Sequence, residues 1–141
     1  MDMNNIIQGS GFHHIAFRTP KWDEAIRFWR DGLGFVPKLE WGEAPQRAAM
    51  LDLGDGNYLE LFEREATGNS DTAERESAAM HFALRVDDCA AALQRARNAG
   101  AQVTLETEEV DFNGKVAPPA KIAFVKAPGG IIVEFFQCDT L

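Results

Sequence analysis

Two histidines and two glutamates recur in the same order along the 141-residue chain: His14 and Glu60 in the first half, His81 and Glu134 in the second. Imidazole nitrogens and carboxylate oxygens bind divalent metal ions of the first transition row and leave other positions for water or substrate. A lone histidine or glutamate in a strand is more often structural. Because the pair is repeated, we expect all four side chains to be metal ligands.

The four residues occupy equivalent positions in an internal repeat. The first copy begins with HHIAFRTPKWDEAIRFWRDGLGF, which is similar to MHFALRVDDCAAALQRARNAGAQV in the second. The copies end with GNYLELFE and GIIVEFFQ, each carrying a central glutamate. The second pair is spaced more widely than the first, which indicates an insertion at the loop-like stretch DFNGKVAPPA.

Each copy predicts one strand, a helix ended by glycine, and three further strands. The strands are expected at 12–18, 35–41, 47–53, 57–63, 79–86, 102–108, 120–126 and 130–137, and the helices at 21–32 and 88–99. This pattern predicts an α+β fold of two tandem βαβββ modules, 1–66 and 79–141, joined by a polar connector at 67–78. We expect the modules to form a curved mixed sheet around a metal cleft.

Alternation along the strands decides which side chains share a face. It places all four candidate ligands opposite an apolar face, and places His13 toward the helix side or at a fraying strand end. The helices supply the apolar cover. The expected core positions of the first module are Trp22, Ala25, Ile26, Phe28, Trp29, Leu33 and Phe35; those of the second helix are Cys89, Ala92, Leu93 and Ala96.

Four further residues are candidates for substrate binding. Arg18 and Arg85 share the ligand face and could bind a substrate carboxylate or neutralise ligand charge. Salt bridging at a strand end is an equally good explanation of the two arginines. Tyr58 and Phe136 are expected at a cleft wall, as are Trp41 and Phe62.

Composition excludes several classes of function. The chain carries 22 acidic against 14 basic residues, a net charge of -8, and has no basic stripe, so nucleic acid is not an expected partner. No apolar run is long enough to span a membrane, and the N-terminus lacks the pattern of a signal peptide. Cys89 and Cys138 show no disulfide or zinc spacing and have acidic neighbours, so we expect reduced bystanders in a cytoplasmic protein.

These segments together resemble the vicinal-oxygen-chelate superfamily, which includes glyoxalase I, methylmalonyl-CoA epimerase, extradiol dioxygenases and fosfomycin-resistance proteins. The resemblance extends over both modules and includes KIAFVKAPGGIIVEFFQ at the end. Glyoxalase I uses His, Glu, His and Glu as ligands, which matches this chain position by position, and it has an arginine at the position of Arg18. The segment ERESAAM before His81 differs from the glutathione-binding segment of glyoxalase I, so the resemblance leaves open whether glutathione is the substrate.

The resemblance implies a lyase or isomerase that moves a proton next to a carbonyl of a small oxygenated substrate through an enediolate stabilised by the metal. Glu134 would be the base, with Glu60 opposite it, and nickel, cobalt or zinc would be favoured over iron or manganese. Two alternatives stay open: an iron(II) dioxygenase in which Glu60 is not a ligand, and a binding protein without catalysis. Related proteins often pair modules across a two-fold interface, so we also expect a homodimer.

Overall fold

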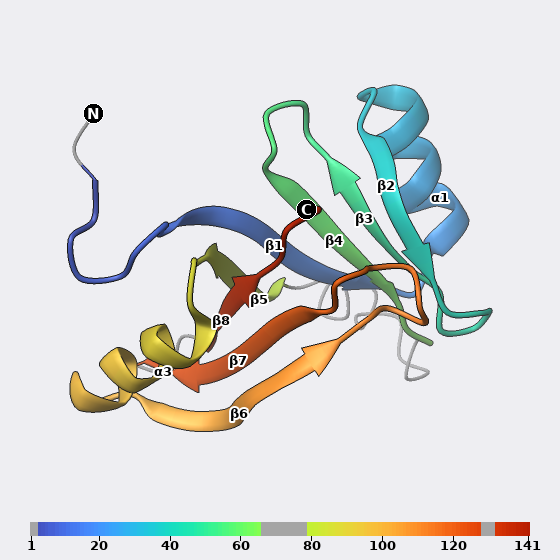
Figure 1. The fold of residues 1–141 in the computed structure, drawn as a ribbon. Coiled ribbons are helices and arrows are strands. Elements are labelled where there is room, and N and C mark those ends of the chain that lie inside the picture. Colours follow the sequence, from blue (N-terminus) through green and yellow to red (C-terminus); the bar gives the residue numbers. More distant parts are fainter. Residues whose placement is uncertain (1–2, 66–78, 128–131) are drawn as a thin grey trace. The chain divides into compact units, whose positions relative to one another are not determined.

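The computed structural model describes residues 3–65, 79–127 and 132–141 (Figure 1). Its first half contains β1 (Gly11–Thr19), α1 (Trp22–Ile26), the π-helical segment η1 (Arg27–Gly32), β2 (Val36–Trp41), β3 (Ala48–Asp52) and β4 (Tyr58–Glu63). Its second half contains β5 (Ala79–Arg85), α3 (Cys89–Asn98), β6 (Gln102–Val110), β7 (Ala120–Lys126) and β8 (Ile132–Gln137). The predicted connector at 67–78 and the expected strand start at 130–131 lie outside the described residues.

The chain divides into two compact units, and the division runs through β1. One unit is His14–Met80. Its strands are ordered β2-β3-β4-β1, with β1 and β4 parallel and the other neighbours antiparallel. Its core packs Trp22 and Ile26 of α1 against the buried side chains Ala49, Leu51, Leu59 and Leu61. Ile15 and Phe17 lie on this core, as their alternation predicts.

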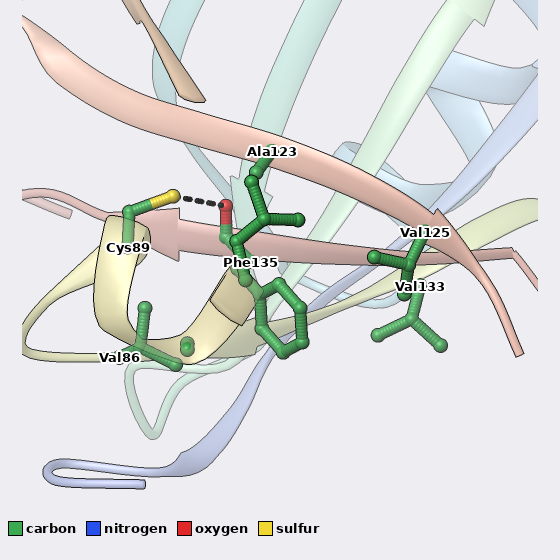
Figure 2. Close-up of a cluster of buried hydrophobic side chains, with 8 residues drawn as sticks. Val86, Cys89, Ala123, Val125, Val133 and Phe135 are labelled. Carbon is green, nitrogen blue, oxygen red and sulfur yellow. Dashed lines mark hydrogen bonds between the residues drawn. The ribbon is translucent and has the colours of Figure 1, made fainter. Parts of the chain in front are cut away.

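The other unit comprises Met1–His13 and His81–Leu141. Its strands are ordered β5-β8-β7-β6, again with a parallel pair, β5 and β8. Figure 2 shows its core, a cluster that includes Val125, Val133, Phe135 and Cys89 at the start of α3. The Cys89 thiol donates a hydrogen bond to the Phe135 carbonyl oxygen at 3.6 Å. Burial raises the pKa of this thiol to about 11, which keeps it protonated and unreactive.

The helix of the first module differs from its prediction. After Ile26 the turns widen, so that the Leu33 N–H donates to the Phe28 carbonyl oxygen five residues back. A wider turn rotates the following side chains away from the face that a regular α-helix would give them. Leu33, expected in the core, is therefore 52% exposed, and Phe28, also expected there, is 54% exposed. Trp29 still packs against the core, stacked on Phe35.

The second helix follows its prediction closely. The Asp88 side chain caps its first turn by accepting a hydrogen bond from the Ala91 N–H at 3.0 Å. Gly100, at a positive φ of 102°, follows the last turn, as Gly34 follows the first helix at 78°. The α+β class and the two βαβββ modules are thus confirmed. No helix in the described part of the chain is long and apolar enough to cross a membrane.

Candidate metal centre

In the unit His14–Met80, strands β1 and β4 bring His14 and Glu60 together. The parallel register pairs His14 with Tyr58 and Ala16 with Glu60, which places the histidine diagonally across from the carboxylate. The His14 Nε2 lies 3.2 Å from the Glu60 Oε1, and the two side chains are 0% and 7% exposed. A carboxylate so deeply buried is costly unless a hydrogen bond, a positive charge or a metal ion compensates it.

The other unit repeats this arrangement on β5 and β8. Ala83 pairs with Glu134, again two residues after the histidine, and the His81 Nε2 lies 2.9 Å from the Glu134 Oε2. These side chains are 8% and 6% exposed. The His81 ring also packs edge-on against Phe124, with centroids 5.0 Å apart, which restricts its orientation. Each unit therefore presents one buried imidazole and one buried carboxylate in the same geometry.

An alanine follows the histidine by two residues in both units. Ala16 and Ala83 are 0% exposed and are the register partners of Glu60 and Glu134. Residues two apart in a strand share a face, so each alanine lies beside its histidine and opposite its glutamate. A methyl group leaves the space through which the longer glutamate side chain reaches the imidazole. The shared His-x-Ala pattern is thus part of the geometry of both pairs.

His13 does not take the position expected from alternation. It is completely buried rather than at a fraying strand end, and its ring centroid lies 4.2 Å from that of Phe136 in the unit to which both belong. The Phe136 ring also contacts Phe112, from the loop between β6 and β7, with the ring centroids 6.4 Å apart. A strand-period argument could not foresee this aromatic cluster, because Phe112 comes from an irregular loop and has a positive φ of 54°.

The candidate substrate-binding residues have different surroundings. Arg18 is exposed on β1, and the Arg85 guanidinium donates to the Phe12 carbonyl oxygen at 3.3 Å. Tyr58 and Phe136 are 6% and 1% exposed. A residue that sequence reasoning did not select, Arg64, lies just beyond β4 with its guanidinium 5.0 Å from the Phe62 ring. Arg64 follows Phe62 by two residues and Glu60 by four, and this spacing was the sequence signal that could have placed it on the same face.

Comparison with known proteins gives a consistent result. The profile of the Glyoxalase/Bleomycin resistance protein/Dioxygenase superfamily matches residues 11–135. The chain is 32% identical over 127 residues to a lactoylglutathione lyase of Haemophilus influenzae, covering 88% of this chain and 90% of that protein. It is 28% identical over 143 residues to a 2-epi-5-epi-valiolone epimerase of an Actinomyces species, covering 89% and 78%. Its fold matches methylmalonyl-CoA epimerase from Mycobacterium tuberculosis with a TM-score of 0.74 at 21% identity, covering 99% and 93%.

Proposed function

Because the chain belongs to the Glyoxalase/Bleomycin resistance protein/Dioxygenase superfamily, we propose that it is a metal-dependent lyase or isomerase that transfers a proton next to a carbonyl of a small oxygenated substrate. The observation that carries this proposal is the occurrence of the same buried His–Glu pair in both units. A protein that only bound a small molecule would not require two such pairs.

The donor set fits a divalent metal ion. We propose that His14, Glu60, His81 and Glu134 together hold one ion, through two imidazole nitrogens and two carboxylate oxygens. Nickel, cobalt or zinc would suit this nitrogen and oxygen set, with iron or manganese as alternatives. When bound, the ion supplies positive charge that polarises a carbonyl and stabilises negative charge on its oxygen.

The glutamates provide the proton transfer. Glu134 removes a proton from the hydroxyl-bearing carbon next to the carbonyl, and the electron pair of that C–H bond shifts toward the carbonyl oxygen. The carboxylic acid then returns the proton to the former carbonyl carbon, while the hydroxyl proton of the first carbon passes to the former carbonyl oxygen. Glu60 has the same position in the other pair and would serve the opposite side of the substrate. Burial of both carboxylates limits the exchange of the transferred proton with water.

The dioxygenase alternative is less well supported. It would need Glu60 to leave the metal and free positions for oxygen and substrate. Glu60 instead pairs with His14 much as Glu134 pairs with His81. The relatives named as a lyase and an epimerase also support proton transfer rather than oxygen chemistry. Nickel, cobalt or zinc with isomerase turnover on hemithioacetals would favour our proposal, and iron with oxygen uptake would favour the dioxygenase.

Two substitutions test the site and the base separately. His81→Ala removes a nitrogen ligand, so we expect reduced metal content after chelation and reloading, measured by elemental analysis. Glu134→Gln removes the base, so we expect turnover on hemithioacetals to fall by about 10²-fold or more. The matched control is Glu109→Gln, an exposed glutamate on β6, which should keep metal and turnover. Full metal content in His81→Ala, or full turnover in Glu134→Gln with its metal retained, would refute the corresponding role.

The assembly and location are further parts of this proposal. We propose a homodimer, as many superfamily members form, acting on a small-molecule substrate. The two cysteines are free, and free cysteines suit a reducing compartment such as the cytoplasm. Size-exclusion chromatography with light scattering measures the oligomeric state directly.

A further inference from the structure

A pocket lies in the unit His14–Met80, beyond the glutamate of that unit. It has a volume of about 310 Å³ and is lined by Trp41, Gln46, Ala48, Phe62 and Arg64. The Trp41 and Phe62 rings meet edge to face, with centroids 6.0 Å apart and planes at 89°. Ala48, only 3% exposed, is the register partner of both aromatic residues and adds only a methyl group to the wall. The two rings offer contacts to a flat group, while Gln46 and Arg64 supply the polar part of the wall.

Strand register connects this pocket to Glu60. Phe62 follows Glu60 by two residues on β4, so both side chains lie on one face, about 7 Å apart along the strand. Ala48 is the register partner of Phe62, and Trp41 that of Ala48, which places the pocket one row beyond Glu60 and its partner Met50. A substrate held beside Glu60 can therefore extend directly into the pocket.

Two arginines bring positive charge to the pocket and to the strand position beside it. The Arg64 guanidinium lies 5.0 Å from the Phe62 ring and uses one N–H to donate to the Glu63 carbonyl oxygen at 2.7 Å. Arg18 is the register partner of Phe62 on β1 and is exposed. Neither arginine forms an ion pair within residues 3–65, 79–127 and 132–141, whereas nearby Arg47 is bound by Glu63 and Asp23. In a chain of net charge -8, two such guanidinium groups mark a place for an anion.

We propose that the substrate carries a flat, aryl-like group ending in a carboxylate, with the ring against the Trp41 and Phe62 side chains and the carboxylate on Arg64. This inference rests on the proposed function, because it requires the oxygenated end of the substrate to be held beside Glu60. It assigns Trp41 and Arg64 as specificity-determining residues. Arg18 would add longer-range attraction, since it extends from the same row of side chains.

Three hydroxamates separate the parts of this proposal, because each offers two neighbouring oxygens to a metal ion. Acetohydroxamate tests chelation alone, benzohydroxamate adds the ring, and 4-carboxybenzohydroxamate, with its two-carbon-longer homologue, adds the carboxylate. Their dissociation constants are measured by calorimetry on the metal-loaded protein. We expect the better carboxylated probe to bind at least about tenfold more tightly than benzohydroxamate, the gain of one charge-assisted hydrogen bond.

Substitutions assign each gain to a residue. Arg64→Met should abolish the preference for the carboxylate and leave benzohydroxamate unchanged, and Arg64→Lys should keep part of it. Trp41→Leu should weaken the aryl probes by about tenfold and leave acetohydroxamate unchanged, which also shows that the variant is folded. The matched control is Arg30→Met, since Arg30 lies on the helix and is paired with Asp31.

The possible failures are distinguishable. If no hydroxamate binds the metal-loaded protein, the proposed metal function fails. If acetohydroxamate binds but the ring and the carboxylate add nothing, or Arg64→Met leaves the carboxylate preference intact, the substrate inference is wrong and the metal function stands.

Discussion

Glu63 and Arg47 form a bidentate ion pair, which makes the stability of the unit His14–Met80 depend on pH. The Arg47 Nη2 and Nε lie 2.7 Å and 2.8 Å from the two carboxylate oxygens, and the Arg47 backbone N–H donates to the same carboxylate. These hydrogen bonds from Arg47 lower the pKa of Glu63 below its ordinary value. The stabilisation of the folded state by this ion pair is therefore fully present above the unfolded pKa of Glu63, and it is lost as pH falls through the folded pKa.

We expect Glu63→Gln to lower the free energy of unfolding at pH 7 by about 1 kcal/mol, because a neutral amide replaces a charge-assisted contact that is partly exposed. The difference between wild type and variant should shrink as pH falls below about 4, and it should disappear once Glu63 is protonated in the folded state as well. Urea unfolding at pH 7 and pH 3 measures it. Asp31→Asn is the control, since the exposed Arg30–Asp31 pair should contribute little. A difference that is the same at both pH values would contradict the assignment.

The metal-ligand candidates were predictable at this scale because the repeat identifies them twice. His14 and His81 head equivalent strands, and their pairing with Glu60 and Glu134 follows from strand alternation. Arg64 was not predictable in the same way. Its significance depends on a pocket whose other walls, Trp41 and Ala48, come from strands distant in sequence.

At the scale of elements, strand register sets the geometry of the His–Glu pairs. This role of the register can be tested without changing any of the four proposed metal ligands. Ala83→Leu adds bulk at the register partner of Glu134 on the face it shares with His81, so we expect the carboxylate to be displaced and metal affinity to fall by about tenfold. Competition with a chelator measures affinity, and thermal unfolding of the metal-free protein measures any loss of stability. Ala90→Leu, on the exposed face of α3, is the matched control.

The interpretation would be wrong if Ala83→Leu bound metal as tightly as wild type. It would also fail if Ala90→Leu weakened metal binding equally, because the effect would then not come from the register position.

Most of the elements were predictable, and the differences have physical causes. Alternation and helical spacing depend on neighbouring residues, so they predict strands and helices within a few positions. The turns of η1 are widened by about one residue per turn, which the sequence does not signal. The apolar spacing of Trp22, Ile26 and Trp29 is unaffected, but Leu33 becomes exposed. The loop that brings Phe112 onto Phe136 follows no period, so its packing could not be predicted.

At the scale of the whole molecule, the question is whether one chain or two supply the four proposed metal ligands. The two units share strand β1, with His13 in one unit and His14 in the other. His13 packs on Phe136, two residues beyond Glu134 on β8, and the next residue in the chain pairs with Glu60. The residue that packs on β8 of one unit is thus directly followed in the chain by the histidine of the other unit's pair. We therefore expect each chain to supply a complete ligand set, also within the proposed homodimer.

Mixing two inactive variants decides between these arrangements. His14→Ala and His81→Ala are co-expressed with different tags, and dimers carrying both are isolated by sequential affinity steps. If the ligands came from different chains, one site of each mixed dimer would combine an intact His14 with an intact His81, and about half of wild-type turnover per dimer would return. If each chain supplies its own set, every site lacks one histidine and turnover stays at the level of the single variants, which is the result we expect. Tagged wild-type dimers carried through the same steps give the reference activity, so recovered turnover in the mixed dimer would mean that the site forms between chains.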